Sequence, residues 1–213
     1  MAIAFGSLLT SGNGGTTSIT TASVTPNASE LTLLVFRSEG NTNATPTVSG
    51  NGLTWTKLSI TGGTAVYQIW YSIGGSPSAG AISVTNLTSG SENLWFVVSF
   101  TGTATTSIFP QTSFSTGSGT ALSTTLAGSI TAGNTAFGFG SRSAGTQSYT
   151  PGTNFTEIGE ASSGSRSGAI EYQLNKTDDA VIDMSSSTSG GWTMIGVEIA
   201  AAAVSSGNFF LLF

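Results

Sequence analysis

The stretch LWFVVSF at residues 94–100 decides the fold class. Successive side chains of an extended chain point to opposite faces, so residues 95, 97 and 99 share one face and residues 96, 98 and 100 share the other. Both faces are largely apolar, which is typical of a strand that is buried on both sides. The stretch therefore predicts a central strand of a β-sandwich.

Other segments repeat this signal in weaker form. Residues 66–71 (VYQIWY) read as a second strand, and residues 170–174 (IEYQL) predict a half-buried strand with Glu171 and Gln173 on its exposed face. Turn-forming clusters such as GNG at residues 50–52 and SGG at residues 189–191 separate the runs. About five or six strands are expected in each half of the chain. This spacing predicts an all-β, jelly-roll-like sandwich.

The composition narrows the range of functions. Ser and Thr number 34 each, and with 29 Gly they make up 97 of 213 residues, yet 38% of the chain is apolar, which indicates a folded core rather than disorder. The chain has no His and no Cys, which excludes disulfides, thiolate or imidazole metal sites and a Ser-His-Asp triad. We expect no metal and no cofactor. Five cationic residues against ten acidic ones give a net charge of −5, so nucleic-acid binding is not expected.

No segment of the chain reads as a targeting or membrane signal. The first positive charge is Arg37, whereas a secretory signal needs basic residues ahead of its apolar stretch. No apolar run approaches the roughly 20 residues of a membrane helix. We therefore expect synthesis in the cytoplasm without export or membrane insertion. A surface rich in Ser and Thr combined with synthesis of this kind is typical of virion proteins, which lysis of the host cell releases.

A weak internal repeat has a period near 100 residues. Five blocks recur in the same order, and together they predict a duplication with pseudo-repeats at about 15–100 and 119–200. The matched blocks are 15–27 with 119–134, 33–38 with 136–141, 51–58 with 153–159, 68–71 with 169–172, and 81–84 plus 94–100 with 180–183 plus 191–197.

The repeat permits two arrangements. Two tandem sandwiches would need a linker near residues 101–118, a stretch of low complexity. Alternatively, residues 1–204 form a single merged sandwich built from both repeats. Ile108, Phe109 and Phe114 lie in the supposed linker and favour a packed connection, so we prefer the single domain.

The last part of the sequence, residues 205–213, is a separate hydrophobic tail. It carries five consecutive large apolar residues: Phe209, Phe210, Leu211, Leu212 and Phe213. Burying them would contribute on the order of 8 kcal/mol before the cost of ordering the chain. The tail either completes a strand of its own sheet or docks on a neighbouring subunit or a larger assembly. We predict oligomer or capsid docking.

Candidate chemical groups are few. Glu157 and Glu160 lie three residues apart and are candidates for the carboxylate pair of a glycosidase. In the repeat, however, Glu157 aligns with Trp55 and Glu171 with Trp70, which indicates surface positions and no catalytic residue. Asp178, Asp179 and Asp183 are interpreted as solvated carboxylates of a turn, and a calcium site formed by them is the weaker alternative. Trp55 and Trp70 are candidate glycan contacts, with packing in the core as the favoured alternative, and Trp55 is expected to be the more exposed of the two. Trp95 and Trp192 occupy equivalent repeat positions and are expected in the core.

Four of these stretches carry a resemblance. SGNGLTWTKL (49–58), VYQIWY (66–71), GAISV (80–84) and LWFVVSF (94–100) resemble a β-sandwich repeat of tailed-phage structural proteins and of some secreted bacterial proteins. The ending GNFFLLF (207–213) is similar to the tails of small phage virion proteins. The resemblance implies a bacteriophage virion accessory protein, such as a capsid decoration (cement) protein. Such proteins bind the outer capsid surface, often as trimers, and they have no catalytic residues to carry over.

The expected function is therefore a viral structural protein, a homotrimer that binds the major capsid protein and stabilises the assembled head. Two alternatives stay open. A carbohydrate-binding module of a phage tail, a fibre or a cell surface would use exposed aromatic residues such as Trp55. A fibre or filament subunit would use the tail to dock head-to-tail on the next copy.

Overall fold

The computed structural model describes all residues of the chain except 1, 15–16, 39–44, 61–66, 88–91 and 204–213. Every regular element of the described residues is a β-strand, which confirms the all-β prediction. No helix in the described part of the chain is long and apolar enough to cross a membrane. The strands are β1 (Ala4–Asn13), β2 (Ile19–Thr20), β3 (Leu31–Ser38), β4 (Thr47–Gly50), β5 (Thr56–Lys57), β6 (Tyr67–Ile73), β7 (Ile82–Thr85), β8 (Asn93–Thr101), β9 (Thr112–Thr125), β10 (Thr135–Arg142), β11 (Tyr149–Pro151), β12 (Thr156–Ser163), β13 (Arg166–Leu174) and β14 (Val181–Ile199).

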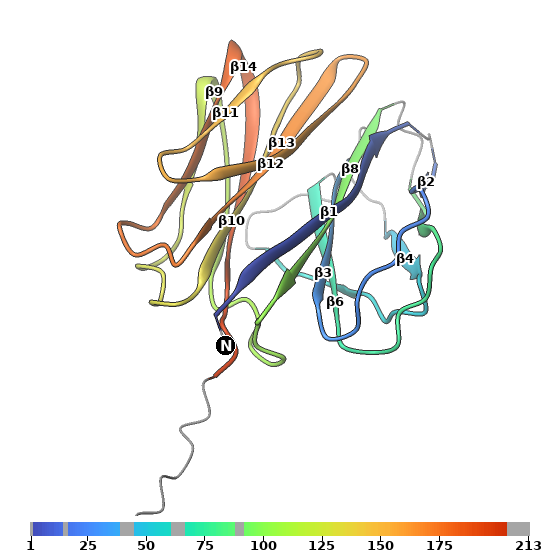
Figure 1. Ribbon diagram of the computed structural model, residues 1–213. Coiled ribbons are helices and arrows are strands. Elements are labelled where there is room, and N and C mark those ends of the chain that lie inside the picture. Colours follow the sequence, from blue (N-terminus) through green and yellow to red (C-terminus); the bar gives the residue numbers. More distant parts are fainter. Residues whose placement is uncertain (1, 15–16, 39–44, 61–66, 88–91, 204–213) are drawn as a thin grey trace, which may run out of the picture.

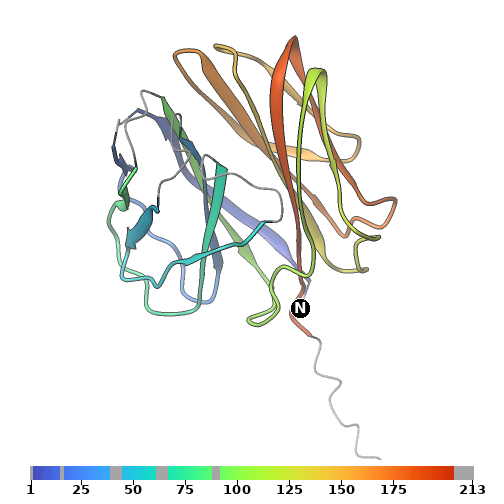
Figure 2. The ribbon, with the colours of Figure 1, turned by 180° about the vertical axis from the view of Figure 1, so that it is seen from behind.

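Two large antiparallel sheets stack face to face in the middle of the molecule (Figure 1). The first has the strand order β1-β8-β3-β6-β5. The second has the order β11-β14-β10-β13-β12, with β9 also paired to β14. A small sheet, β2-β7-β4, covers the outer face of the first large sheet, as the rear view in Figure 2 also shows.

The central core lies between the two large sheets. It takes Phe96, Val98 and Phe100 from one face of β8, whereas Trp95 and Val97 on the other face belong to an outer core. This division explains why both faces of residues 94–100 are apolar. The central core consists of Ile3, Leu31, Leu33, Val35, Ile69, Leu94, Phe96, Val98, Phe100, Ile108, Phe137, Phe139, Ile170, Ile195, Val197 and Ile199.

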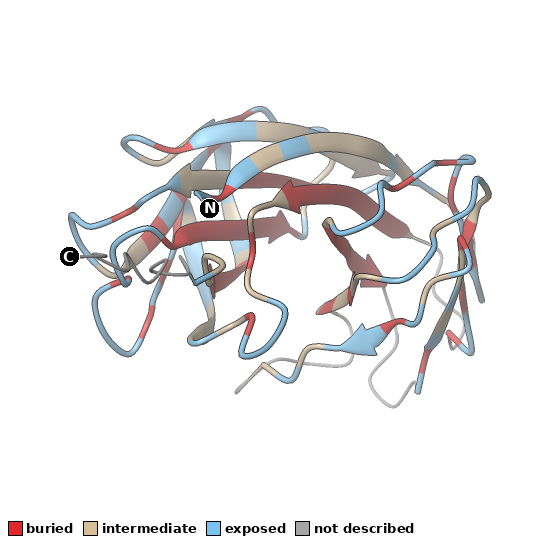
Figure 3. Cartoon of the chain, turned by 60° about the horizontal axis from the view of Figure 1, so that its bottom comes forward, coloured by how far each residue is buried: buried red, intermediate tan, exposed pale blue. Residues whose placement is uncertain are grey.

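Each half of the chain also has an outer core of its own. In the first half, β2 and β7 pack Ile19, Ile82 and Val84 against the large sheet. In the second half, the long strands β9 and β14 continue past the large sheet and, with β11, cover its outer face. Figure 3 shows the result, with buried strands in the middle of the molecule and exposed segments around them.

The two halves share one strand order. β1-β8-β3-β6-β5 in the first half corresponds to β9-β14-β10-β13-β12 in the second. The correspondence extends to side chains, because Gly12 lies opposite Trp95 across β1 and β8, and Gly117 lies opposite Trp192 across β9 and β14. Only glycine fits either place, since an added Cβ would lie 2.7 Å from the Trp95 ring and would overlap the Trp192 ring in the second half. The duplication remains a prediction, and this shared arrangement supports it.

The matched block 33–38 with 136–141 has the wrong register. Phe36 lies opposite Trp95, and Arg142 lies opposite Trp192, so the strand positions of β3 and β10 correspond three residues away from the match of 33–38 with 136–141. The sequence match paired Leu33 with Ala136, yet Leu33 faces the central core and Ala136 an outer core. A shift by an odd number of residues exchanges the two faces of a strand.

The connection between the halves is packed. Ile108 is part of the central core, and Phe109 and Phe114 contact it. Residues 112–118, which the sequence analysis considered as linker, belong to β9. The last described residues run antiparallel to this connection, because Ala200 N donates to the carbonyl of Ile108 and Ala202 N donates to that of Gly102.

Candidate functional site

The five predicted docking residues, Phe209 to Phe213, lie outside the described residues. The described chain nevertheless fixes where the tail begins. Ala201 forms a β-bridge with Thr103, and the chain passes residues 102–103 on its way to residue 203. The surface next to this point is therefore the first place to look for a docking site.

A groove of about 440 Å³ opens beside this point, and we call it the aromatic groove. Its apolar side chains come from β6, from the segment after β5 and from the connection between the halves. The rings of Tyr71 and Phe109 contact each other edge to face with centroids 5.0 Å apart. The lining residues are Thr56, Leu58, Tyr71, Ile73, Thr105, Thr106, Ser107, Ile108 and Phe109.

The prediction that Trp55 is more exposed than Trp70 is wrong, and the favoured alternative of core packing holds for Trp55. Its side chain is only 9% exposed and packs in the outer core of the first half, with Nε1 3.4 Å from the carbonyl oxygen of Gly50. The cause is the preceding turn, where Asn51 (φ 58°) donates from Nδ2 to three backbone carbonyls and fixes the turn against neighbouring segments. Trp55 therefore presents no ring face to a sugar.

Trp70 is half-buried against the same outer core, and its Nε1 donates to Oε1 of Gln68 at 2.8 Å. The two candidate glycan contacts thus share an outer core and do not form an open platform. Trp95 is buried, as expected, and Trp192 is half-buried against the other outer core.

Glu157 and Glu160 do lie on the same face of β12. A β-bulge between residues 157 and 159 shifts the strand by one position, so Glu157 lies opposite Glu171 and Glu160 lies opposite Ala169. Both glutamates are exposed. Partial burial raises the pKa of Glu157, and the charge of Glu160 adds to the rise.

Glu171 is not a surface residue, which contradicts the sequence analysis. It is 1% exposed, because residue 152 and the neighbouring strand β11 cover this part of the sheet. Its Oε2 accepts a hydrogen bond from Gly152 N at 3.1 Å, whereas Oε1 has no partner. Burial raises the pKa of Glu171 to about 8, and the charges of Asp183 and Glu157 add to the rise. At neutral pH this carboxyl is therefore largely protonated and closed off from solvent.

The three aspartates do not converge on a calcium site. Asp178 and Asp179 each place a carboxylate oxygen 2.7 Å from Nζ of Lys176. Among the described residues no group of three or more acidic side chains could hold a metal ion. The hydrogen bond from Lys176 lowers the pKa of Asp178 to about 2. The cluster acts as an ion-pair network that holds Lys176, itself almost fully buried, over the ring of Phe155.

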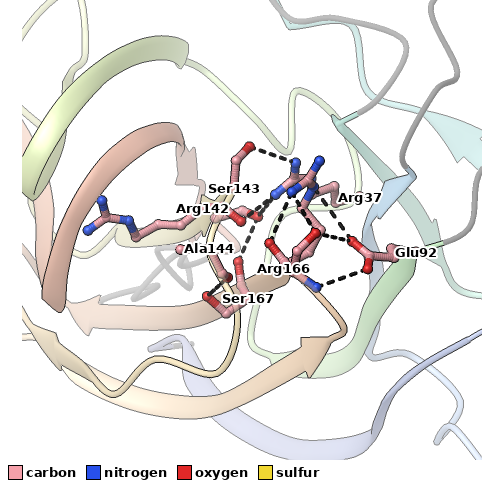
Figure 4. Close-up of polar contacts among 9 residues, drawn as sticks. Arg37, Glu92, Arg142, Ser143, Ala144, Arg166 and Ser167 are labelled. Atoms are coloured by element: carbon pink, nitrogen blue, oxygen red, sulfur yellow. Dashed lines mark hydrogen bonds and ion pairs between the residues drawn. The ribbon is translucent and has the colours of Figure 1, made fainter.

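A polar seam joins the two halves at the end of β3 and was not anticipated from the sequence (Figure 4). It consists of Arg37, Glu92, Ser141, Ser143, Ser165 and Arg166. The buried Arg37 donates from Nη1 to Ser141 Oγ at 3.1 Å and to the carbonyl of Arg142 at 2.6 Å, and from Nη2 to Ser143 Oγ at 3.2 Å. No local pattern could reveal these contacts, because they join residues 104 to 106 positions apart.

Glu92 completes the seam from the first half. Its carboxylate accepts hydrogen bonds from N and Oγ of Ser165, both at 2.9 Å, and lies 3.8 Å from Nε of Arg166. Gly164, with φ 56°, lies so close to this carboxylate that a Cβ would overlap Glu92. The turn between β12 and β13 is thereby held against the opposite half.

A second, polar groove of about 370 Å³ lies between the end of β1 and β12. Hydroxyl and amide side chains and Glu160 line it, and it contains no aromatic ring. Glu160 is already engaged, since its Oε1 accepts a hydrogen bond from Tyr149 N at 2.5 Å.

Comparison of the chain with protein-family models, with curated proteins and with solved structures found no match.

Proposed function

We propose that the chain is a non-enzymatic structural protein of a tailed-phage virion, a decoration protein that binds the outer surface of the assembled head. Its partners are further copies of itself, in a homotrimer, and the major capsid protein. Residues 209–213 make the docking contact.

The observation that carries the proposal is the way the two halves are joined. Both large sheets bury one face in the same central core, and the seam around Arg37 fixes their edges to each other. Packed sheets of this kind resist deformation, since protein cores are dense and yield little to load. A protein that reinforces a pressurised shell needs this stiffness.

Binding to the assembled lattice alone would stabilise the head by mass action. Every bound copy lowers the free energy of the closed shell relative to its separated subunits, without any chemical step. A surface rich in uncharged Ser and Thr side chains suits a protein that stays in contact with solvent outside the cell.

The proposal can be tested on particles of the phage that encodes the chain. Gold-labelled antibodies against the protein should mark the whole head surface. Deleting the gene should lower the temperature at which heads release DNA, and purified full-length protein should restore it. A variant that ends at Ser206 should fold but fail to restore it. Unlabelled particles, or label confined to tails or fibres, would overturn the assignment to the head.

A further inference from the structure

We infer that the aromatic groove is the receptor for residues 209–213 of a second copy of this chain. The inference rests on the docking role proposed above for these residues, but not on the virion itself. It supplies what that role lacks, namely the surface on which the tail docks.

The groove suits a short apolar strand. Its walls offer Leu58, Tyr71, Ile73 and Phe109, all only half-buried, so their remaining surface is open to an apolar partner. β5 forms one margin and is the edge strand of its sheet, since β6 is the one strand that pairs with it among the described residues. An edge strand can accept a further strand through its backbone, while adjacent pockets receive alternate side chains.

The tail has the matching pattern. In an extended segment Phe209, Leu211 and Phe213 point to one face, and Phe210 and Leu212 to the other. Added beside β5, the segment would place three large apolar side chains towards the groove. Thr56, Thr105 and Thr106 would flank them with hydroxyl groups.

The course of the chain favours a second copy over the same copy. From Glu198 to Ala202 the backbone bonds successively to residues 111, 108 and 102, so it moves away from Phe109 as it leaves the described part. Residues 105–107 form a loop between two hydrogen bonds to Ala200, and this loop separates the chain's exit from the groove. To enter its own groove the tail would have to reverse around the loop within residues 204–208, a spacer that spans about 17 Å at most.

A tail that enters a neighbour's groove makes a heterologous contact. Repeated around a rotation axis, such contacts close into a ring. The expected homotrimer is one such ring, in which each copy gives one tail and receives one.

Disulfide trapping tests the inference directly, because the chain has no cysteine of its own. Thr106→Cys is combined in turn with Phe209→Cys and with Phe213→Cys, two positions on the face of the tail that points to the groove, in the full-length protein, which is then oxidised and run on denaturing gels. We expect covalent dimers and larger species that disappear on reduction. The matched control is Thr146→Cys, an exposed threonine of the polar groove, with the same tail cysteines, and it should remain monomeric.

A faster-migrating monomer, closed by a disulfide within one chain, would overturn the inference in favour of the same copy. The absence of any disulfide in both folded variants would exclude the groove as the receptor. Light scattering provides the second readout: Tyr71→Ser and the variant ending at Ser206 should each weaken self-association at least tenfold. If trapping succeeds while labelling of phage heads fails, the groove is supported as the receptor of the tail, and the assignment to the virion is wrong.

Discussion

The buried carboxyl of Glu171 should make the stability of this protein fall as the pH rises. In the unfolded chain the pKa of a glutamate is near 4.5, whereas burial raises the folded value to about 8. Between these two values the native state therefore holds a proton that the unfolded state has released. The contribution of Glu171 to stability is therefore greatest below pH 4.5, decreases through neutral pH and levels off above pH 8.

The size of the effect follows from the shift. One pKa unit corresponds to about 1.4 kcal/mol, so the full difference is about 5 kcal/mol, of which about 3 kcal/mol is already lost at pH 7. Glu171→Gln removes the titration and keeps the shape of the side chain. Between pH 4.5 and pH 9 we expect the free energy of unfolding of the wild type to fall by about 5 kcal/mol more than that of the variant.

Urea unfolding at pH 4.5, 7 and 9, extrapolated to water, measures the difference. The quantity compared is the change of the unfolding free energy with pH. A constant cost of burying the amide lowers the stability of the variant equally at every pH and does not affect this comparison. Glu157→Gln is the matched control, since Glu157 lies directly opposite Glu171 but is exposed, and its effect should be small. Parallel stability curves for the wild type and Glu171→Gln would refute the reasoning, because Glu171 would then ionise as readily in the fold as in the unfolded chain.

Three further predictions concern the interior. Arg37→Met should lower the free energy of unfolding by about 3 kcal/mol in urea titrations, because a buried carbonyl and two hydroxyls lose their donor. Gly117→Ala should cost about 1–3 kcal/mol in the same assay, because the added methyl overlaps a tryptophan ring. Lys176→Met should raise the pKa of Asp178 from about 2 towards 3.8 in carbon-detected NMR titrations. In the wild type this ion pair stabilises the fold above pH 4, and the stabilisation is lost on acidification towards pH 2; the variant should lack this contribution.

Two of these predictions have a control within the chain. Gly80→Ala adds the same methyl where nothing lies within 4 Å and should leave stability unchanged. Ser143→Ala removes one acceptor of Arg37 and leaves Ser141 Oγ and the carbonyl of Arg142 in place, so it should cost less than Arg37→Met. An equal loss in Gly80→Ala and Gly117→Ala would contradict the steric argument, and an unshifted Asp178 would contradict the ion pair.

Alternation along the chain predicted the strands but not what covers them. Residues 94–100 were identified as a strand buried on both sides because both faces are apolar, and the structure agrees. The polar face of residues 170–174 was read as exposed, yet Glu171 lies beneath residue 152. A period of two assigns a residue to a face, whereas its burial depends on a segment elsewhere in the chain.

A β-bulge, an error of register and contacts between distant segments account for what the sequence did not predict. The bulge in β12 moves Glu160 to the face of Glu157, which simple alternation would forbid for residues three apart. The repeat match at residues 33–38 failed for a related reason. In a chain of such restricted composition, a shift of three residues still aligns apolar residues with apolar residues, but it exchanges the two faces of the strand. The aromatic groove combines residues 56–73 with residues 105–109, and no local motif marks such a combination.

The distribution of positive charge carries the argument about the surface one step further. Of the five cationic residues, Arg37, Arg142 and Lys176 are at most 3% exposed, Arg166 is half-buried in the seam, and only Lys57 is exposed. The positive charges thus mostly hold the interior together: Arg37 joins the halves, and Arg142 donates to Ser186 and to the carbonyl of Thr188. Glu171 and Glu198 are buried as well, so the exposed residues keep a net negative charge, which disfavours a phosphate-backbone partner. It is consistent with the proposal above, in which the groove and the tail recognise another copy through apolar contact.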